Sequence, residues 1–307
     1  MCSSDLAIPS TTLIVEDSHI GRQGAIDSGA KLLAVEDAGD LTWEKVEKAI
    51  MEMNDRTQKK VPWRDAKMNV LIPMAGAGSR FATMGYTFPK PLIEVRGKPM
   101  IQVVVENLNV EANFTFIVQK EHYDKYNLKY LLNLIAPNCN IVQVDGVTEG
   151  AACTTLLARE LINNDQPLLI ANSDQFIEWN SNEVLYAFNN DEIDAGILSF
   201  TATHPKWSYA KLDKNGFVSE VAEKKVISDN ATVGVYFWKR GSDYVKYADK
   251  MMEDDANRVN GEWYVCPVFN EAIKDGKRVR VKKITKMWGI GTPEDLNYFL
   301  DHYEGDV

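Results

Sequence analysis

VLIPMAGAGSRF, residues 70–81, and FPKPLIEVRGKPMI, residues 88–101, form the stretch of sequence that decides the fold. A short apolar run leads into a glycine-rich turn that ends at Arg80, and Lys90 follows between two prolines. Glycines let backbone N–H groups approach phosphate oxygens closely, and the two basic side chains add positive charge. We expect the prolines to hold the backbone around Lys90 in extended conformations. The stretch therefore predicts a strand followed by a phosphate-binding loop, Ala75-Gly76-Ala77-Gly78-Ser79.

Two other phosphate-binding patterns do not fit this loop. The sequence contains no GxxxxGK[ST] string, and the third glycine of GxGxxG is replaced by Phe81. The two glycines alone are weak support, because glycine-rich turns after strands are common. The specific signal is the whole string, with Arg80 and the Pro-Lys-Pro unit at this spacing.

Residues 70–101 resemble the signature of the sugar-phosphate nucleotidyltransferases, the sugar-nucleotide pyrophosphorylases, which include the glucose-1-phosphate thymidylyltransferases. The resemblance continues to about residue 301 and agrees with the strands and helices that alternate from residue 68 onward. It implies an α/β fold of the nucleotide-diphospho-sugar transferase type, with a mostly parallel Rossmann-like sheet and helices on both faces. It also implies transfer of a nucleoside monophosphate from a nucleoside triphosphate to a sugar 1-phosphate, giving a nucleotide sugar and pyrophosphate with Mg²⁺ as cofactor.

The resemblance assigns the phosphate and metal ligands. Arg80 and the loop amides would hold the β- and γ-phosphates, and Lys90 would lie at the α-phosphate. Asp174 follows an apolar run at 168–171, and ligands of open α/β sheets collect at such strand ends. A carboxylate there is the hard oxygen ligand that Mg²⁺ prefers, and the family's aspartate at this place binds the metal.

The resemblance also assigns the base and sugar contacts. Glu149-Gly150 opens a segment where relatives read the base through main-chain groups, although Gly-Ala-Ala stands here in place of their Gly-Thr-Ala. The Glu223-Lys224 pair would contact a sugar hydroxyl and the sugar phosphate. Tyr209 stands in the family's Tyr-Gly position, and Gly234 would leave room for the sugar.

One position departs from the family pattern. Relatives carry a second metal-binding aspartate where this chain has Gly289. Three explanations are open: the magnesium keeps extra waters, Asp145 or Glu149 substitutes, or activity is lost. Alternative functions are a catalytically silent nucleotide or sugar-phosphate-binding module and a GT-A-type glycosyltransferase. The latter usually needs Asp-x-Asp, whereas Gln175 and Phe176 follow Asp174 here.

The sequence before residue 68 predicts a separate fragment and a linker. Residues 1–53 read as a truncated α/β fragment, and its residues 7–50 resemble the carboxyl-terminal end of a haloacid-dehalogenase-type phosphatase through Val15-Glu16-Asp17-Ser18. No DxD nucleophile loop precedes them, so we expect no phosphatase activity, and we expect Ser18 to act as a helix N-cap. The polar residues 54–67 predict a linker, and residues 68–307 the nucleotidyltransferase domain.

Composition narrows the remaining possibilities. A net charge of −10 argues against a general nucleic-acid binder. The four cysteines form no CxxC pair, and no apolar run approaches the ~18 residues of a membrane span. We therefore expect a cytoplasmic protein whose partners are a nucleoside triphosphate and a sugar 1-phosphate. A homo-oligomer, the base and the sugar remain open.

The hydrophobic pattern places the other elements of the main domain. An Asn-Gly pair at residues 215–216 predicts a hairpin between strands at 209–212 and 217–222. Buried strands are expected at 70–73, 114–118, 141–144 and 168–171, and helices at 98–109, 151–162, 182–189, 241–253 and 293–302.

Overall fold

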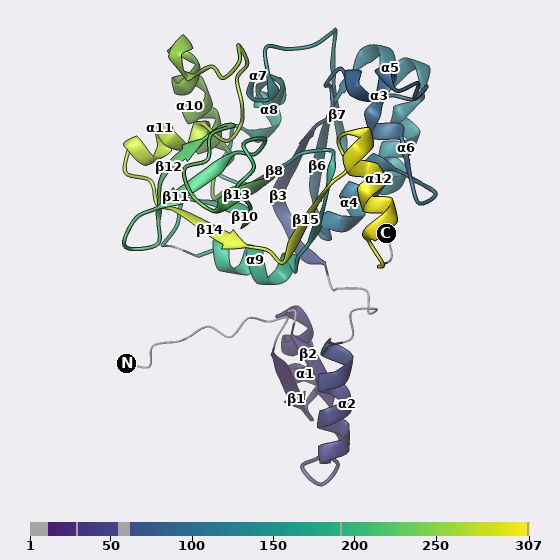
Figure 1. The fold of residues 1–307 in the computed structure, drawn as a ribbon. Helices are drawn as coiled ribbons and strands as arrows, with labels where there is room; N and C mark the ends of the chain where they lie inside the picture. Colours follow the sequence, from purple (N-terminus) through teal and green to yellow (C-terminus); the bar gives the residue numbers. More distant parts are fainter. Residues whose placement is uncertain (1–11, 29, 55–61, 191, 306) are drawn as a thin grey trace. The chain divides into compact units, whose positions relative to one another are not determined.

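The computed structural model describes residues 12–28, 30–54, 62–190, 192–305 and 307. The chain divides into two compact units (Figure 1). The first comprises residues 1–64 and 180–187, and the second comprises residues 65–179 and 188–307. Among the described residues, no helix combines the length and the apolar character that crossing a membrane requires.

The amino-terminal part of the first unit has two strands and two helices among its described residues, consistent with the predicted α/β fragment. Its two strands pair in parallel, and Ser18 caps the helix between them by accepting a hydrogen bond from Gly21 N at 3.0 Å. Residues 7–11 of the predicted phosphatase-like fragment lie outside the described residues, and that resemblance stays a prediction. The elements are β1 (Leu13–Glu16), α1 (His19–Asp27), β2 (Lys31–Ala34) and α2 (Trp43–Asn54).

A mixed sheet of nine strands forms the second unit's framework, in the order β12-β11-β13-β8-β3-β6-β7, with β10 paired to β13 and β14. The β3–β8, β6–β7 and β10–β14 pairs are parallel, whereas β13 lies antiparallel to β8. The strands are β3 (Trp63–Pro73), β6 (Val110–Gln119), β7 (Asn140–Val144), β8 (Leu168–Ala171), β10 (Ala195–Thr201), β11 (Tyr209–Leu212), β12 (Val218–Ala222), β13 (Asn230–Trp238) and β14 (Val279–Lys283).

Helices cover both faces of this sheet. Figure 1 shows α3 to α6 and α12 on one side and α7, α8, α10 and α11 on the other. These helices are α3 (Ser79–Thr83), α4 (Met100–Leu108), α5 (Lys120–Lys125), α6 (Leu128–Ile135), α7 (Ala151–Leu156), α8 (Arg159–Ile162), α10 (Gly241–Met252), α11 (Val268–Lys274) and α12 (Pro293–His302). A further helix, α9 (Ser181–Phe188), falls almost entirely in the first unit. Short strands complete the fold: β4 (Glu94–Val95), β5 (Lys98–Pro99), β9 (Gln175–Glu178) and β15 (Lys286–Gly289).

Aromatic packing fixes the carboxyl-terminal helices on the sheet. Trp238 at the end of β13 is 1% exposed and stacks on Phe269 of α11, with ring centroids 4.5 Å apart. Tyr244 of α10 packs against the same indole. Burying such rings stabilises the folded chain by roughly 2–3 kcal/mol each, so this cluster holds the framework behind the site.

Two sequence predictions need correction here. The single helix expected at 151–162 is two short helices, because Thr155 Oγ1 bonds back to Ala152 O and the chain turns at Leu157 and Ala158. The linker predicted at 54–67 is too long at its end, because β3 begins at Trp63 and Asn113 Nδ2 bonds Ala66 O at 2.8 Å. Residues 55–61 of that linker lie outside the described residues.

Candidate active site

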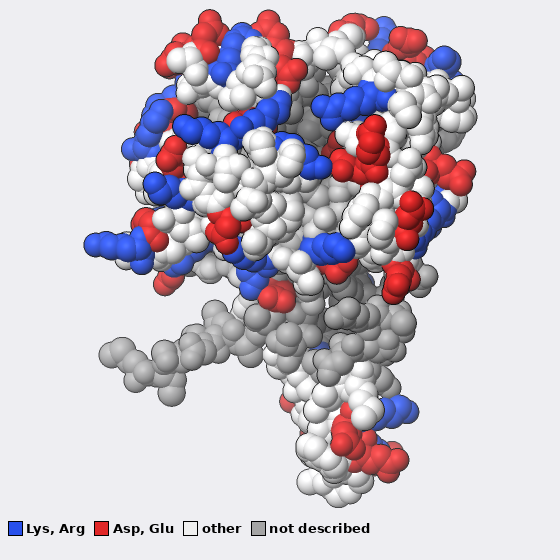
Figure 2. Space-filling model, viewed as in Figure 1, with Lys and Arg blue, Asp and Glu red and all other residues white. Residues whose placement is uncertain are grey.

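A cavity of about 640 Å³ opens in the second unit, where the loops after β3 and β8 face the β11–β12 hairpin. Figure 2 shows acidic and basic side chains interspersed over the visible face of the protein. The charge within the cavity is therefore described from the residues that line it. Ten of the predicted site residues line it: Ala75, Gly76, Ala77, Arg80, Lys90, Gly150, Asp174, Glu223, Lys224 and Gly234. Four others do not: Gly78, Ser79, Glu149 and Tyr209.

The glycine loop leaves β3 and enters α3. Gly78 has a φ of 59°, a left-handed conformation that glycine adopts without strain. A Cβ there would lie 3.3 Å from the Cβ of Lys90, so the loop and the lysine are in close contact. Gln119 Nε2 donates to Ala75 O at 2.8 Å and fixes the loop to the end of β6. The loop's backbone thus faces the cavity while its far side packs on the protein.

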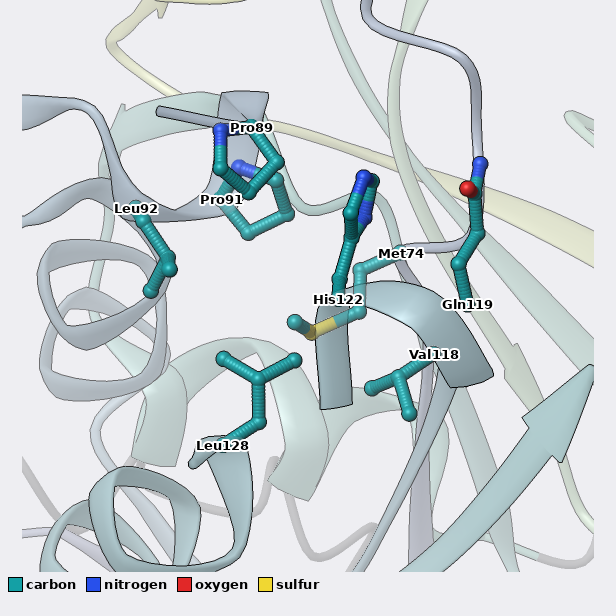
Figure 3. A pocket seen from close by; sticks show the side chains of 8 residues that line it. All are labelled: Met74, Pro89, Pro91, Leu92, Val118, Gln119, His122 and Leu128. Atoms are coloured by element: carbon teal, nitrogen blue, oxygen red, sulfur yellow. The ribbon is translucent and has the colours of Figure 1, made fainter. Parts of the chain in front are cut away.

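Lys90 opens one turn of 3-10 helix, Lys90–Leu92, so the extended backbone predicted for it was wrong. Pro91 fits this first turn because its fixed φ is helical and the turn needs no N–H from it. Pro89, Pro91 and Leu92 line a small apolar pocket, together with Met74, Val118, Gln119, His122 and Leu128 (Figure 3). The two prolines therefore pack on the protein while the lysine between them lines the cavity.

Lys90 and Asp174 both line the cavity and form an ion pair there. Lys90 Nζ lies 2.8 Å from Asp174 Oδ2, and both side chains are mostly buried, with exposed fractions of 20% and 29%. Asp174 O accepts a hydrogen bond from Ile290 N at 3.0 Å, which fixes the aspartate to the segment after β15. The predicted catalytic lysine and the predicted metal ligand thus form one ion pair.

The segment at Gly289 lies against a different carboxylate from those suggested by the sequence. A Cβ on Gly289 would lie 3.3 Å from Oδ2 of Asp295, and Asp295 lines the cavity. Glu149 instead forms an ion pair with Arg258 at 2.6 Å, and neither it nor Asp145 lines the cavity. Among the predicted substitutes and Asp295, only Asp295 is placed to fill this position.

Gly150 is required for internal packing. Its φ is 133°, and a Cβ would lie 2.4 Å from Trp263 O and 2.5 Å from Trp263 N. Main-chain bonds join the same segments, from Trp263 N to Glu149 O at 2.9 Å and from Ala152 N to Trp263 O at 3.0 Å. The sequence predicted that the Gly150 backbone approaches a nucleotide base closely. In the structure, the space that a Gly150 side chain would fill is occupied by the backbone of Trp263.

Glu223 and Lys224 project from the end of β12 into the cavity. Burial raises the pKa of the Glu223 carboxyl. A hydrogen bond from Ser208 Oγ and the positive charge of Lys224 lower that pKa, but by less. Lys224 has a φ of 54°, unusual for a non-glycine residue, and its Nζ bonds Tyr264 Oη and lies over that ring. Both side chains are therefore held by specific contacts and do not extend freely into solvent.

The remaining predicted sugar contacts have internal packing roles. Gly234 has a φ of 77°, and a Cβ there would lie 2.2 Å from Asn172 Nδ2 and 2.8 Å from Gln175 Oε1. Tyr209 is fully buried, and its hydroxyl donates to His204 O at 2.8 Å. The space beside Gly234, which was predicted for the sugar, is taken up by the Asn172 and Gln175 amides. Tyr209 supports the loop before β11 through its bond to His204.

Sequence reasoning missed part of the cavity lining. Lys206 and Trp207 come from the loop between β10 and β11, Cys266 precedes α11, and Asp295 lies in the first turn of α12. Burial raises the pKa of the Cys266 thiol far above its usual range, so it lines the wall as a neutral group. Of these four residues, only Asp295 has a sequence signal, because it ends the string Gly-Thr-Pro-Glu-Asp at residues 291–295, just after Gly289.

A family model described as "Nucleotidyl transferase" matches residues 69–304. The chain is 25% identical over 229 residues to a mannose-1-phosphate guanyltransferase of Yarrowia lipolytica, covering 71% of this chain and 54% of the relative. It is 26% identical over 233 residues to a bifunctional sugar-1-phosphate nucleotidylyltransferase/acetyltransferase of Sulfurisphaera tokodaii, covering 75% and 54%. The chain therefore spans about half the length of these relatives.

A solved structure supports the predicted fold. The nucleoside-diphosphate-sugar pyrophosphorylase of Vibrio cholerae RC9 superposes with a TM-score of 0.66 and 25% identity, covering 76% of this chain and 100% of that one. The superposition confirms the predicted fold type.

Proposed function

Because the chain belongs to the nucleotidyl transferase family, we propose that it transfers a nucleoside monophosphate from a nucleoside triphosphate to a sugar 1-phosphate, releasing pyrophosphate. The observation that carries the proposal is the meeting of Arg80, Lys90 and Asp174 in one cavity with Lys224. With Lys206, four basic side chains line one cavity of an acidic protein, which suits two phosphorylated substrates that must be brought together.

The chemistry proposed is an in-line displacement. An oxygen of the sugar phosphate attacks the α-phosphorus, a new P–O bond forms, and the bond to the β-phosphate oxygen breaks. The attacking phosphate is already ionised at neutral pH, so no strong general base is needed. The protein's contribution is therefore to position two anions and to offset the charge of the transition state.

Three of the four basic residues in the cavity have a place in this scheme. Arg80 and the amides of the glycine loop hold the β- and γ-phosphates, which leave as pyrophosphate. Lys90 lies at the α-phosphate, and the packed prolines beside it hold its turn in place. Lys224, held at Tyr264, anchors the phosphate of the sugar.

The family also implies Mg²⁺, and the donors in the cavity fit it. Asp174 is a part-exposed carboxylate at the cavity floor, the hard oxygen ligand that Mg²⁺ takes beside substrate phosphates. When bound there, the ion would offset negative charge on the phosphate oxygens.

The test is pyrophosphate release with Mg²⁺, for each of the four common triphosphates against a panel of sugar 1-phosphates. GTP with mannose 1-phosphate is the first pair to try, since one relative bears that activity in its name. Release that needs one triphosphate and one acceptor together supports the proposal. Bound triphosphate without release for any pair would contradict it and favour a silent binding module.

The matched control is an Asp145→Asn variant, which alters a carboxylate outside the cavity lining, beside Asp174→Asn inside it. Loss of release in Asp174→Asn alone would tie the activity to the cavity. Equal loss in both would point to a defect of folding rather than of the site.

A further inference from the structure

Two carboxylates lie against one short segment between β15 and α12. A Cβ on Gly291 would lie 2.4 Å from Asp174 Oδ2, and a Cβ on Gly289 would lie 3.3 Å from Asp295 Oδ2. A side chain at 291 would displace the first carboxylate, and one at 289 would press on the second. The two glycines thus allow carboxylates from β8's end and from α12 to approach the same turn.

Each of these carboxylates is paired with a lysine. Lys90 Nζ lies 2.8 Å from Asp174 Oδ2, and Lys206 Nζ lies 3.1 Å from Asp295 Oδ1. All four side chains line the one cavity, and Asp295 retains an exposed fraction of 33%. Both acids are therefore within reach of a ligand in the cavity, and both carry a partner that such a ligand can take away.

A triphosphate would compete for these lysines. Its oxygens are strong acceptors for ammonium groups, and a lysine that turns toward a phosphate leaves its aspartate without a counter-charge. A divalent cation that arrives with the triphosphate restores the balance, because it prefers hard oxygen ligands and commonly takes one or two carboxylates beside the phosphates. Lysines on phosphates and carboxylates on the cation keep every charge paired.

We propose that Asp295 is the second protein carboxylate for the divalent cation of the triphosphate, acting with Asp174 in place of the side chain that Gly289 lacks. Lys206 then exchanges Asp295 for a substrate phosphate. This inference rests on the proposed function, since it concerns the same substrate. The competing role for Asp295 is structural: it lies in the first turn of α12, where its backbone N–H is capped by Thr292 Oγ1 at 3.1 Å.

The experiment is a titration of Mn²⁺, followed by electron paramagnetic resonance, into full-length protein with a triphosphate and no acceptor. We expect Asp295→Asn to weaken Mn²⁺ binding by about 10- to 100-fold, as when a supporting group of a metal site is lost. The matched control is Glu294→Gln, which alters the neighbouring acid of the same helical turn and does not line the cavity. Mn²⁺ binding by Asp295→Asn that equals the wild type would overturn the proposal.

A double variant separates a metal ligand from a helix-terminus charge. Gly289→Asp combined with Asp295→Asn returns one carboxylate to the cavity, and Gly289 has no left-handed φ that would oppose it. Recovery of Mn²⁺ binding in this variant supports the proposal. Failure to recover, with circular dichroism unchanged, would overturn it.

The two hypotheses fail in different ways. Wild-type pyrophosphate release with undiminished Mn²⁺ binding in Asp295→Asn removes the role of Asp295 and leaves the proposed function intact. Absence of release for every substrate pair removes the proposed function, while the titration still decides whether Asp295 holds the cation.

Discussion

Lys90 Nζ lies 2.8 Å from Asp174 Oδ2, although the two residues are 84 positions apart in the sequence. The pair joins the loop after β3 to the end of β8, two neighbouring parallel strands whose carboxyl ends meet at one edge. Both side chains are largely removed from solvent, so each holds the other in place. The lysine proposed for the α-phosphate and the acid proposed for the cation are therefore positioned together.

Replacing Lys90 by alanine should lower kcat by about 100-fold or more, because one preorganised charge at the α-phosphate is lost. The KM for the triphosphate should change much less, since Arg80 and the loop amides remain. Steady-state kinetics of pyrophosphate release measure both constants. Lys246→Ala, which breaks the surface pair with Asp275 outside the cavity, should leave both unchanged. Wild-type turnover in Lys90→Ala would show that the role assignment is wrong.

Replacing Lys224 by alanine should raise the KM for the sugar phosphate about tenfold or more, because a charge-assisted hydrogen bond to its phosphate is lost. The kcat should be affected less than in Lys90→Ala. Lys225→Ala is the matched control, since Lys225 is the next residue and does not line the cavity. A KM that rises equally in both variants would indicate a general loss of positive charge and not a specific anchor.

The buried carboxyl of Glu223 should make the protein less stable as pH rises. Burial raises its pKa above the ordinary value of 4.5, so the folded state resists ionisation that the unfolded chain allows. The stabilising contribution of the neutral form is present below about pH 4.5 and is lost as pH rises through the folded-state pKa. Lys224 favours ionisation, and Glu262 opposes it.

A Glu223→Gln variant cannot ionise, so its stability should not share this loss. Thermal unfolding measured from below pH 4.5 upward should show the stability of the variant relative to the wild type rising with pH and levelling off once the folded-state pKa is passed. Ser208→Ala serves as a control for the hydrogen bond, because the carboxyl then remains but its donor is removed. Parallel curves for wild type and Glu223→Gln would refute the titration.

Gly150→Ala should be far more destabilising than Gly146→Ala. Both glycines have a positive φ, 133° and 80°, so both substitutions incur backbone strain of about 1–3 kcal/mol. Only at 150 does the new methyl group meet the backbone of Trp263, at 2.4 Å from its oxygen, whereas 146 has open space. Urea unfolding of the two variants measures the difference. Equal losses would mean that the approach to Trp263 relaxes without cost.

Hydrophobic pattern alone identified much of the framework. The runs at 168–171 and 293–302 coincide with β8 and α12, because a fully apolar strand and a capped amphipathic helix carry local signals. Pattern did not reveal β13, whose nine residues are buried although its sequence includes Asn230, Thr232 and Gly234. Asn230 and Gly234 suit the strand because their partners, Ala210 O and the Asn172 amide, come from other parts of the fold. Thr232 instead bonds Tyr236 Oη within the strand.

The sequence by itself determined the family, the glycine loop and most of the charged residues at the cavity, because short-range strings such as Pro-Lys-Pro and Glu-Lys carry those signals. Only the tertiary structure decided which residues meet: Lys90 with Asp174, Gly150 with Trp263, and Lys206 with Asp295. The physical reason is that ion pairs and close approaches depend on distances across the folded chain. Spacing along the sequence does not encode those distances, so the carboxylate beside Gly289 could not be identified before the fold was known.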